Sequence, residues 1–78
     1  MLPMMEHEAK ALKLLGQNIR KLRRDMGLSQ EEFAHRADID RSYIGQIERG
    51  ERNIAFVNTL KIARALGVKV SYLTDGIE

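Results

Sequence analysis

The side chains best suited to chemistry with a ligand are Arg41, Ser42 and Gln46, which lie close together in the sequence. Arginine can bond two acceptors of guanine at once, glutamine can pair with adenine, and a serine hydroxyl can meet a donor or an acceptor on a base edge. If the segment is helical, we expect Gly45 on the same outward face, where it would allow close approach. Solvated side chains are the alternative, with Arg41 held by a local ion pair to Asp40. The residue types favour readout of bases in the DNA major groove.

A short helix is expected just before these residues. Gly27 can adopt the positive φ that ends one helix, and Ser29 can cap the next. Glu32 lies three residues after Ser29, so its side chain can reach back in a capping box. Phe33 and Ala37 then belong to a narrow apolar stripe of about two turns. A helix this short needs neighbours on which to bury that stripe.

A second short helix would carry the candidate side chains themselves. The segment Asp38-Ile39-Asp40 interrupts the helical periodicity, and Asp40 is a good N-cap for a helix from Arg41 to Arg49. Ile44 and Ile47 would face inward, and Gly50 would end the helix. Two helices joined by three or four turn residues fit the helix-turn-helix geometry.

The remaining hydrophobic pattern predicts an all-α chain. A long first helix is expected from residue 7 or 8 to Gly27, and a fourth helix from residue 56 or 57 to Gly67. Asn53 can cap the fourth helix, and Ser71 can cap a final single turn. The expected buried stripe of the fourth helix is Val57, Leu60, Ala63 and Leu66.

Three groups of residues form a recognisable pattern between Leu15 and Gly76: Leu28-Ser29-Gln30-Glu31-Glu32-Phe33-Ala34; Ile44 with Ile47-Glu48-Arg49-Gly50; and Leu60, Ala63 and Ala65-Leu66-Gly67-Val68. Together they resemble the Cro/C1-type helix-turn-helix family of phage and bacterial repressors. The resemblance implies a five-helix, lambda-repressor-like domain that binds palindromic operators as a homodimer. The chain departs from the family at Asp38, where glycine is frequent, although aspartate is among the few other residues that tolerate the left-handed region.

A narrower resemblance rests on Asp40-Arg41-Ser42-Tyr43-Ile44 and on Ile47-Glu48-Arg49-Gly50-Glu51-Arg52-Asn53. These segments are similar to the controller proteins of restriction-modification systems. This narrower resemblance implies that Arg52 and Asn53 contact the DNA backbone or the minor groove. The broader family resemblance implies that Gln30 reaches a phosphate and braces the recognition helix, with a surface glutamine as the alternative.

Several roles stay open at this stage. Tyr43 can contact a phosphate or a thymine methyl, or it can lie partly in the core. Arg49 can bind phosphate or remain solvated, and Asn53 cannot use the same oxygen both for DNA and as a helix cap. The predicted DNA-binding residues are Gln30, Arg41, Ser42, Tyr43, Gln46, Arg49, Arg52 and Asn53.

Two further sets of residues have structural roles in this interpretation. Glu48 would repel a phosphate, which favours a structural role, and the family resemblance pairs it with Arg23. Apolar residues left over near the C-terminal end, once the core is assigned, are expected to form a dimer contact. They are Ile54 and Phe56, with the segment from Val68 to Leu73, of which Val70 and Leu73 are the main candidates.

Length and composition limit the alternatives. The 78 residues fit a flexible end at 1–6 and a single DNA-binding domain at 7–78, and the modest core favours dimerisation. A net charge of +2 alone would not indicate nucleic acid. The absence of cysteine removes disulfides and cysteine-ligated zinc. His7 and His35 are expected on the surface, with no metal site and no cofactor. No catalytic constellation is recognised, so we do not expect an enzyme.

The sequence therefore predicts a homodimeric, sequence-specific transcriptional regulator of double-stranded DNA, with a restriction-modification controller as the narrower interpretation. A phage-type or generic repressor and an antitoxin-like protein-interaction module are the alternatives. RNA polymerase is a candidate further partner. No apolar run approaches the ~20 residues of a membrane span, and the acidic start is unlike a signal peptide. The expected location is the cytoplasm of a bacterium, where a bacterial or phage-encoded regulator would associate with the nucleoid.

Overall fold

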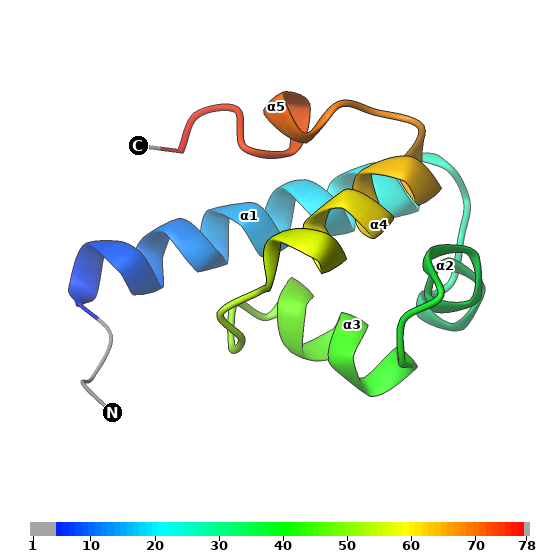
Figure 1. Cartoon of the computed structure of the whole chain (residues 1–78), viewed down its shortest axis with the longest axis horizontal. Coiled ribbons are helices and arrows are strands. Elements are labelled where there is room, and N and C mark those ends of the chain that lie inside the picture. The colour runs from blue at the N-terminus through cyan, green and yellow to red at the C-terminus, as the bar shows by residue number, and fades with distance from the viewer. Residues whose placement is uncertain (1–4, 78) are drawn as a thin grey trace.

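A long helix, α1, runs through the middle of the computed structural model, which describes residues 5–77 (Figure 1). It packs against α3, α4 and α5, while α2 packs against α3 and α4. In the view of Figure 1, α3 and α5 lie on opposite sides of α1. The predicted all-α class with five helices is confirmed, and no strand occurs among residues 5–77. The helices are α1 (Glu6–Asp25), α2 (Gln30–Ala37), α3 (Arg41–Glu48), α4 (Phe56–Leu66) and α5 (Val70–Leu73).

The start of α1 differs slightly from the prediction. The helix begins at Glu6, one or two residues earlier than the apolar periodicity indicates. The Glu8 side chain accepts the Met5 N–H at 2.9 Å and so stabilises this earlier start. Residues 1–4 of the predicted flexible end lie outside the described residues. No helix in the described part of the chain is long and apolar enough to cross a membrane.

Each of the first four helices is followed, within two residues, by a residue in the left-handed region, which turns the chain back over the helix end. After α1, the Leu28 N–H donates to the Arg23 carbonyl oxygen (3.2 Å) and the Gly27 N–H to that of Arg24 (2.9 Å), the Schellman arrangement. Asp38 takes the same place after α2, with φ 56° and ψ 48°. The left-handed residues that follow these four helices are Gly27, Asp38, Gly50 and Gly67.

The core draws one fully buried side chain from every helix. These five side chains are Ile19 of α1, Phe33 of α2, Ile44 of α3, Ile62 of α4 and Leu73 of α5. Smaller or partly exposed apolar residues from the same helices surround them. Burial of such large side chains is the main favourable term in folding, so all five helices are needed to complete the core.

The predicted stripe of α4 is wrong in its first turn. Val57 is 63% exposed, whereas Thr59 and Ile62 are buried together with Ala63 and Leu66. Thr59 can occupy a buried place because its hydroxyl donates to the Ala55 carbonyl oxygen at 3.2 Å. A pattern search that counts only apolar residues misses this position.

Two predicted caps are also wrong. The N-cap of α4 is Ala55 and that of α5 is Lys69, and neither uses a side-chain hydrogen bond. Asn53 therefore lies before the cap, and Ser71 lies inside α5. With no capping duty, the Asn53 side chain has no conflict between two roles.

Close backbone contacts fix α1 relative to the rest of the molecule. A Cβ atom at Gly16 would lie 2.4 Å from the carbonyl oxygen of Ile47 and 2.6 Å from that of Glu48, so only glycine permits this crossing of α1 and α3. On the other side, the Asn18 side-chain amide donates to the carbonyl oxygens of Leu73 (2.8 Å) and Asp75 (3.3 Å). These contacts hold α3 and α5 on α1.

Candidate nucleic-acid interface

The N-terminus of α2 is closed by the predicted capping box. The Glu32 N–H donates to the Ser29 hydroxyl at 3.0 Å, and the Ser29 N–H donates to the Glu32 carboxylate at 2.9 Å. The hydrogen bond from the Ser29 backbone is the main reason that the pKa of Glu32 lies below its ordinary value. The box fixes where α2 begins, and with it the position of Gln30.

Asp40 caps α3, as predicted, and its carboxylate also accepts the hydroxyl of Ser42. Its Oδ1 accepts the Ser42 N–H at 2.8 Å and also the Ser42 hydroxyl. The hydrogen bond from the Ser42 side chain is the largest cause of the lowered pKa of Asp40. The carboxylate is thus engaged by Ser42, and the alternative ion pair with Arg41 does not form. Because the hydroxyl proton points to Asp40, Ser42 presents its lone pairs to an approaching donor.

The outward face of α3 begins with Arg41 and Ser42, which are exposed, and continues with Tyr43 and Gln46, which are half-buried. The expectation that Gly45 belongs to this open face is wrong. Gly45 is buried, because the Arg49 guanidinium and the Gln30 side chain lie over it.

The loop after α3 adds a cation to this face. The Arg52 guanidinium lies 4.9 Å from the centre of the Tyr43 ring, a cation–π contact. Of the predicted alternatives for Tyr43, the structure shows the partial core position, and the contact with the Arg52 cation on the outer side of the ring was not predicted. Asn53 is exposed in the same loop. The shallow groove along this edge is lined by Asp38, Ile39, Asp40, Ser42, Tyr43, Gln46, Arg52 and Asn58.

A buried ion pair fastens the inner side of α3. Arg23 Nε donates to Glu48 Oε2 at 2.7 Å, and Nη2 donates to Oε1 at 3.0 Å. The third donor of Arg23 used here, Nη1, meets the Leu28 carbonyl oxygen at 2.8 Å. Gln30 Nε2 also donates to Glu48 Oε1, at 3.1 Å. The structure therefore joins α1, α2 and α3 through one carboxylate, and no buried polar side-chain atom of the described residues lacks a partner.

An exposed ion pair lies on the outer side of the same helix end. Arg49 Nε donates to Glu51 Oε2 at 2.9 Å, and this hydrogen bond lowers the pKa of Glu51 and raises that of Arg49. Sequence reasoning singled out Arg49 but missed Glu51. The signal was an acid two residues after an arginine, across a glycine that reverses the chain.

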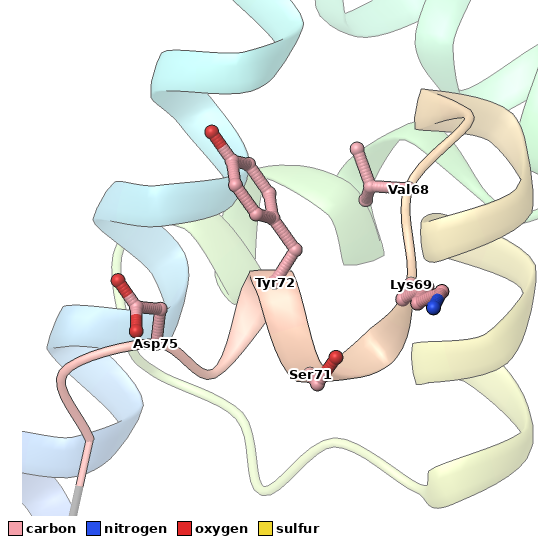
Figure 2. Close-up of a pocket in the computed structure, with 5 residues that line it drawn as sticks. All are labelled: Val68, Lys69, Ser71, Tyr72 and Asp75. Atoms are coloured by element: carbon pink, nitrogen blue, oxygen red, sulfur yellow. The ribbon is translucent and has the colours of Figure 1, made fainter.

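The four predicted dimer residues do not share one environment. Phe56 is largely exposed, while Ile54 and Val70 are half-buried. Leu73 is fully buried in the core of the single chain, so its assignment to a dimer contact is wrong. The exposed aromatic residue of α5 is its neighbour Tyr72, whose ring stands beside α1 (Figure 2). A shallow groove next to it is lined by Val68, Lys69, Ser71, Tyr72 and Asp75.

The two histidines, His7 and His35, are exposed, as predicted. Among residues 5–77, no group of three or more histidine, aspartate or glutamate side chains is placed to hold a metal ion.

The fold, the capped helix pair and the polar outer face of α3 define a helix-turn-helix protein. A family model described as helix-turn-helix matches residues 19–73. The chain belongs to this family and is a DNA-binding transcriptional regulator; the family consists of DNA-binding regulators and not of enzymes.

Its relatives include proteins with a narrower description. Control protein C.MunI of a Mycoplasma species is 45% identical over 64 residues, covering 81% of this chain and 86% of the relative. Control protein C.BamHI of Bacillus amyloliquefaciens is 44% identical over 63 residues, covering 80% and 78%. The crystal structure of the restriction-modification controller protein C.AhdI from Aeromonas hydrophila matches with a TM-score of 0.78 and 48% identity, covering 80% of this chain and 94% of that one.

Proposed function

We propose that this protein is a controller of a restriction-modification system that binds a palindromic operator as a homodimer through α3. The observation that carries the proposal is the arrangement of α3 itself. Its inner side is fastened by Glu48 to Arg23 and Gln30, and its outer side presents Arg41, Ser42 and Gln46. The similarity to several control proteins supports the narrower description.

In the proposed complex, the N-terminal half of α3 lies in the major groove. Arg41 bonds to a guanine, and Gln46 bonds to an adenine or to a flanking group. Ser42 accepts from a base amino group, because its own proton is directed to Asp40. Sequence discrimination in this proposal comes from these three side chains.

Phosphate contacts surround this centre. Gln30 uses one amide hydrogen on Glu48 and keeps the second for a phosphate oxygen. Arg49 and Asn53 flank the helix end, and Arg52 is presented by the Tyr43 ring. Such contacts read no base directly, and they supply affinity that falls as salt rises.

Dimerisation is proposed through exposed and half-buried apolar residues near α4 and α5. Ile54, Phe56 and Val70 remain in this surface, and Tyr72 replaces Leu73 as the aromatic or aliphatic contact of α5. Two-fold symmetry would place the two α3 helices at half-sites about one helical turn apart. RNA polymerase is proposed as a partner if the regulator activates transcription.

The test of this function is selection of bound sequences from a randomised duplex pool, followed by binding of the selected duplex across a salt series. An inverted repeat bound with a steep salt dependence is expected. Binding without any sequence preference would overturn the proposal and favour a protein-interaction role.

Sedimentation of Phe56→Glu as a monomer is expected, and an unchanged dimer would remove Phe56 from the contact.

The contribution of Arg41 can be measured on the selected operator. Arg41→Ala is expected to cost about 1–3 kcal/mol of binding free energy and to relax specificity at one base position in each half-site. Equal binding of wild type and variant to a series of single-base operator variants would remove Arg41 from this role.

A further inference from the structure

We propose that Glu51 is a specificity-determining residue, which holds Arg49 in the free protein and so weakens binding to DNA of arbitrary sequence. The inference rests on the proposed place of Arg49 beside the DNA backbone. Glu51 competes with phosphate for one guanidinium, and the exchange of partners is completed only when α3 is seated in its operator.

The first support is the fixed geometry of the turn that brings Glu51 back to Arg49. The Gly50 N–H donates to the Ile47 carbonyl oxygen (3.0 Å) and the Glu51 N–H to that of Gln46 (2.9 Å), which is a Schellman closure. Gly50 has φ +74°, and a Cβ there would lie 2.8 Å from Lys13 Cα, so this turn is packed against the backbone of α1. The spacing of Glu51 from Arg49 is thus set by rigid backbone.

The second support is the surface on which the Arg49 side chain lies. A Cβ atom at Gly45 would lie 3.2 Å from Arg49 Nη1 and 3.8 Å from Gln30 Oε1. Because Gly45 has no side chain, Arg49 Nη1 can lie close to α3 near Gln30 Oε1, while Arg49 Nε donates to Glu51. Arg49 is therefore held close to a residue proposed to contact phosphate, with its charge balanced by Glu51.

The third support is that the pair can be exchanged. The side chains of Arg49 and Glu51 are 59% and 54% exposed, and ion pairs in such positions are weak because water and salt screen them. A phosphate aligned by a seated α3 can displace Glu51. On a random duplex the recognition helix is not seated, so Arg49 stays with Glu51 and one phosphate contact is lost from each subunit.

The size of the effect follows from counterion release. One additional phosphate contact steepens the slope of log affinity against log salt by about 0.9, which corresponds to roughly an eightfold change in affinity at about 0.1 M salt. Glu51→Gln is therefore expected to raise affinity for a random duplex about fivefold to tenfold per subunit and to raise operator affinity less. The ratio of operator to random affinity falls.

The experiment is a double-mutant cycle of wild type, Glu51→Gln, Arg49→Gln and the double variant. Each protein is titrated against the selected operator and against a random duplex of equal length, over a salt series. The proposal expects the Glu51→Gln gain on random duplex to disappear when Arg49 is already glutamine. Asp25→Asn is the matched control, because it removes the acid of another exposed ion pair, Lys21–Asp25 at 3.1 Å on α1. It is expected to leave both affinities unchanged.

The outcomes separate this inference from the proposed function. An equal gain with and without Arg49, the same gain from Asp25→Asn, or no gain at all overturns the role of Glu51 while leaving operator recognition intact. If wild type itself shows no preference for any selected sequence, the proposed function fails, and the role of Glu51 fails with it.

Discussion

Glu48 and Arg49 are adjacent in the sequence, yet their ion pairs, which have similar N–O distances, differ in burial and in the separation of the partners along the chain. Glu48 meets Arg23 at 2.7 Å with side chains that are 2% and 9% exposed. Arg49 meets Glu51 at 2.9 Å on the open surface. The partners of the inner pair are 25 residues apart in the sequence and lie on different helices, whereas those of the outer pair are two residues apart. Because the two pairs differ in burial, we expect unequal contributions to stability in spite of their similar distances.

The difference follows from desolvation. The Glu48 carboxylate is removed from water and depends on donors from Arg23 and Gln30, so loss of one partner leaves an uncompensated charge in the interior. Water solvates Arg49 and Glu51 whether or not they are paired. The C-terminal end of α3 therefore carries a buried ion pair that holds the helix to α1, and next to it an exposed ion pair that water can replace.

The largest expected effect comes from removing one side of the inner pair. Glu48→Ala leaves the buried Arg23 guanidinium without its carboxylate and is expected to lower the unfolding free energy by about 3–5 kcal/mol. Denaturant unfolding followed by circular dichroism measures the loss. Replacing both partners by apolar residues, Arg23→Met with Glu48→Leu, is expected to cost less than the single change. A double variant as unstable as the single one would contradict this account of the comparison.

The next effect tests how much stability depends on the close crossing of α1 and α3, which also brings the inner pair together. Gly16→Ala places a methyl group against the backbone of Ile47 and Glu48, and the overpacking is expected to cost about 1–3 kcal/mol of stability. The measurement is the denaturant midpoint at constant slope. Gln17→Ala, at the exposed neighbouring position, serves as control and is expected to change stability by less than about 0.5 kcal/mol. Equal effects at the two positions would rule out the crossing as the cause.

A smaller effect is expected at the cap that positions Gln30. Ser29→Ala removes the acceptor of the Glu32 N–H and is expected to cost about 1 kcal/mol. Thermal unfolding detects such a loss. Ser71→Ala is the comparison, because Ser71 is exposed and caps no helix. The two variants should separate clearly in midpoint temperature, and coincident midpoints would argue against the cap.

The smallest effect is expected for the outer pair. Glu51→Gln should leave the thermal midpoint near neutral pH almost unchanged, because both side chains are solvated. The hydrogen bond from Arg49 lowers the pKa of Glu51 from its ordinary value of 4.5. Any contribution of the pair is therefore present above pH 4.5 and is lost as the pH falls through the lowered value. Midpoints of wild type and variant should converge in acid. A loss as large as that of Glu48→Ala would erase the distinction between the two pairs.

Local chemistry allowed much of the fold to be predicted. Ser29 with Glu32, and Asp40 before α3, begin their helices through side-chain hydrogen bonds to residues nearby in sequence. The left-handed conformation of Asp38 is one that aspartate tolerates, and the family resemblance indicated a turn there. Such features depend on neighbours within a few residues, which is why the sequence indicates them.

The errors arose at residues whose burial is decided by packing between segments that are distant in the sequence. Leu73 and Val57 are both apolar, but only Leu73 finds neighbours on other helices that bury it. Gly45 is covered by side chains from α2 and from the end of α3, which no helical periodicity reveals. The partners Glu48 and Arg23 are 25 residues apart, so local sequence patterns could not indicate their pairing. The family resemblance indicated it instead.

The hydrogen bond from the Asn18 side chain to the Leu73 carbonyl oxygen has a consequence for synthesis of the chain. Its partners are 55 residues apart, a stretch that a ribosome translates in roughly 3–11 s at about 5–20 residues per second. During that interval α1 has been made, but the residues that complete its contacts have not. Leu73 is the last of the five fully buried side chains to be synthesised. Because Leu73 completes the core, we expect a nascent chain that lacks α5 to expose apolar surface on α1 and α4 and to fold cooperatively only once α5 is available.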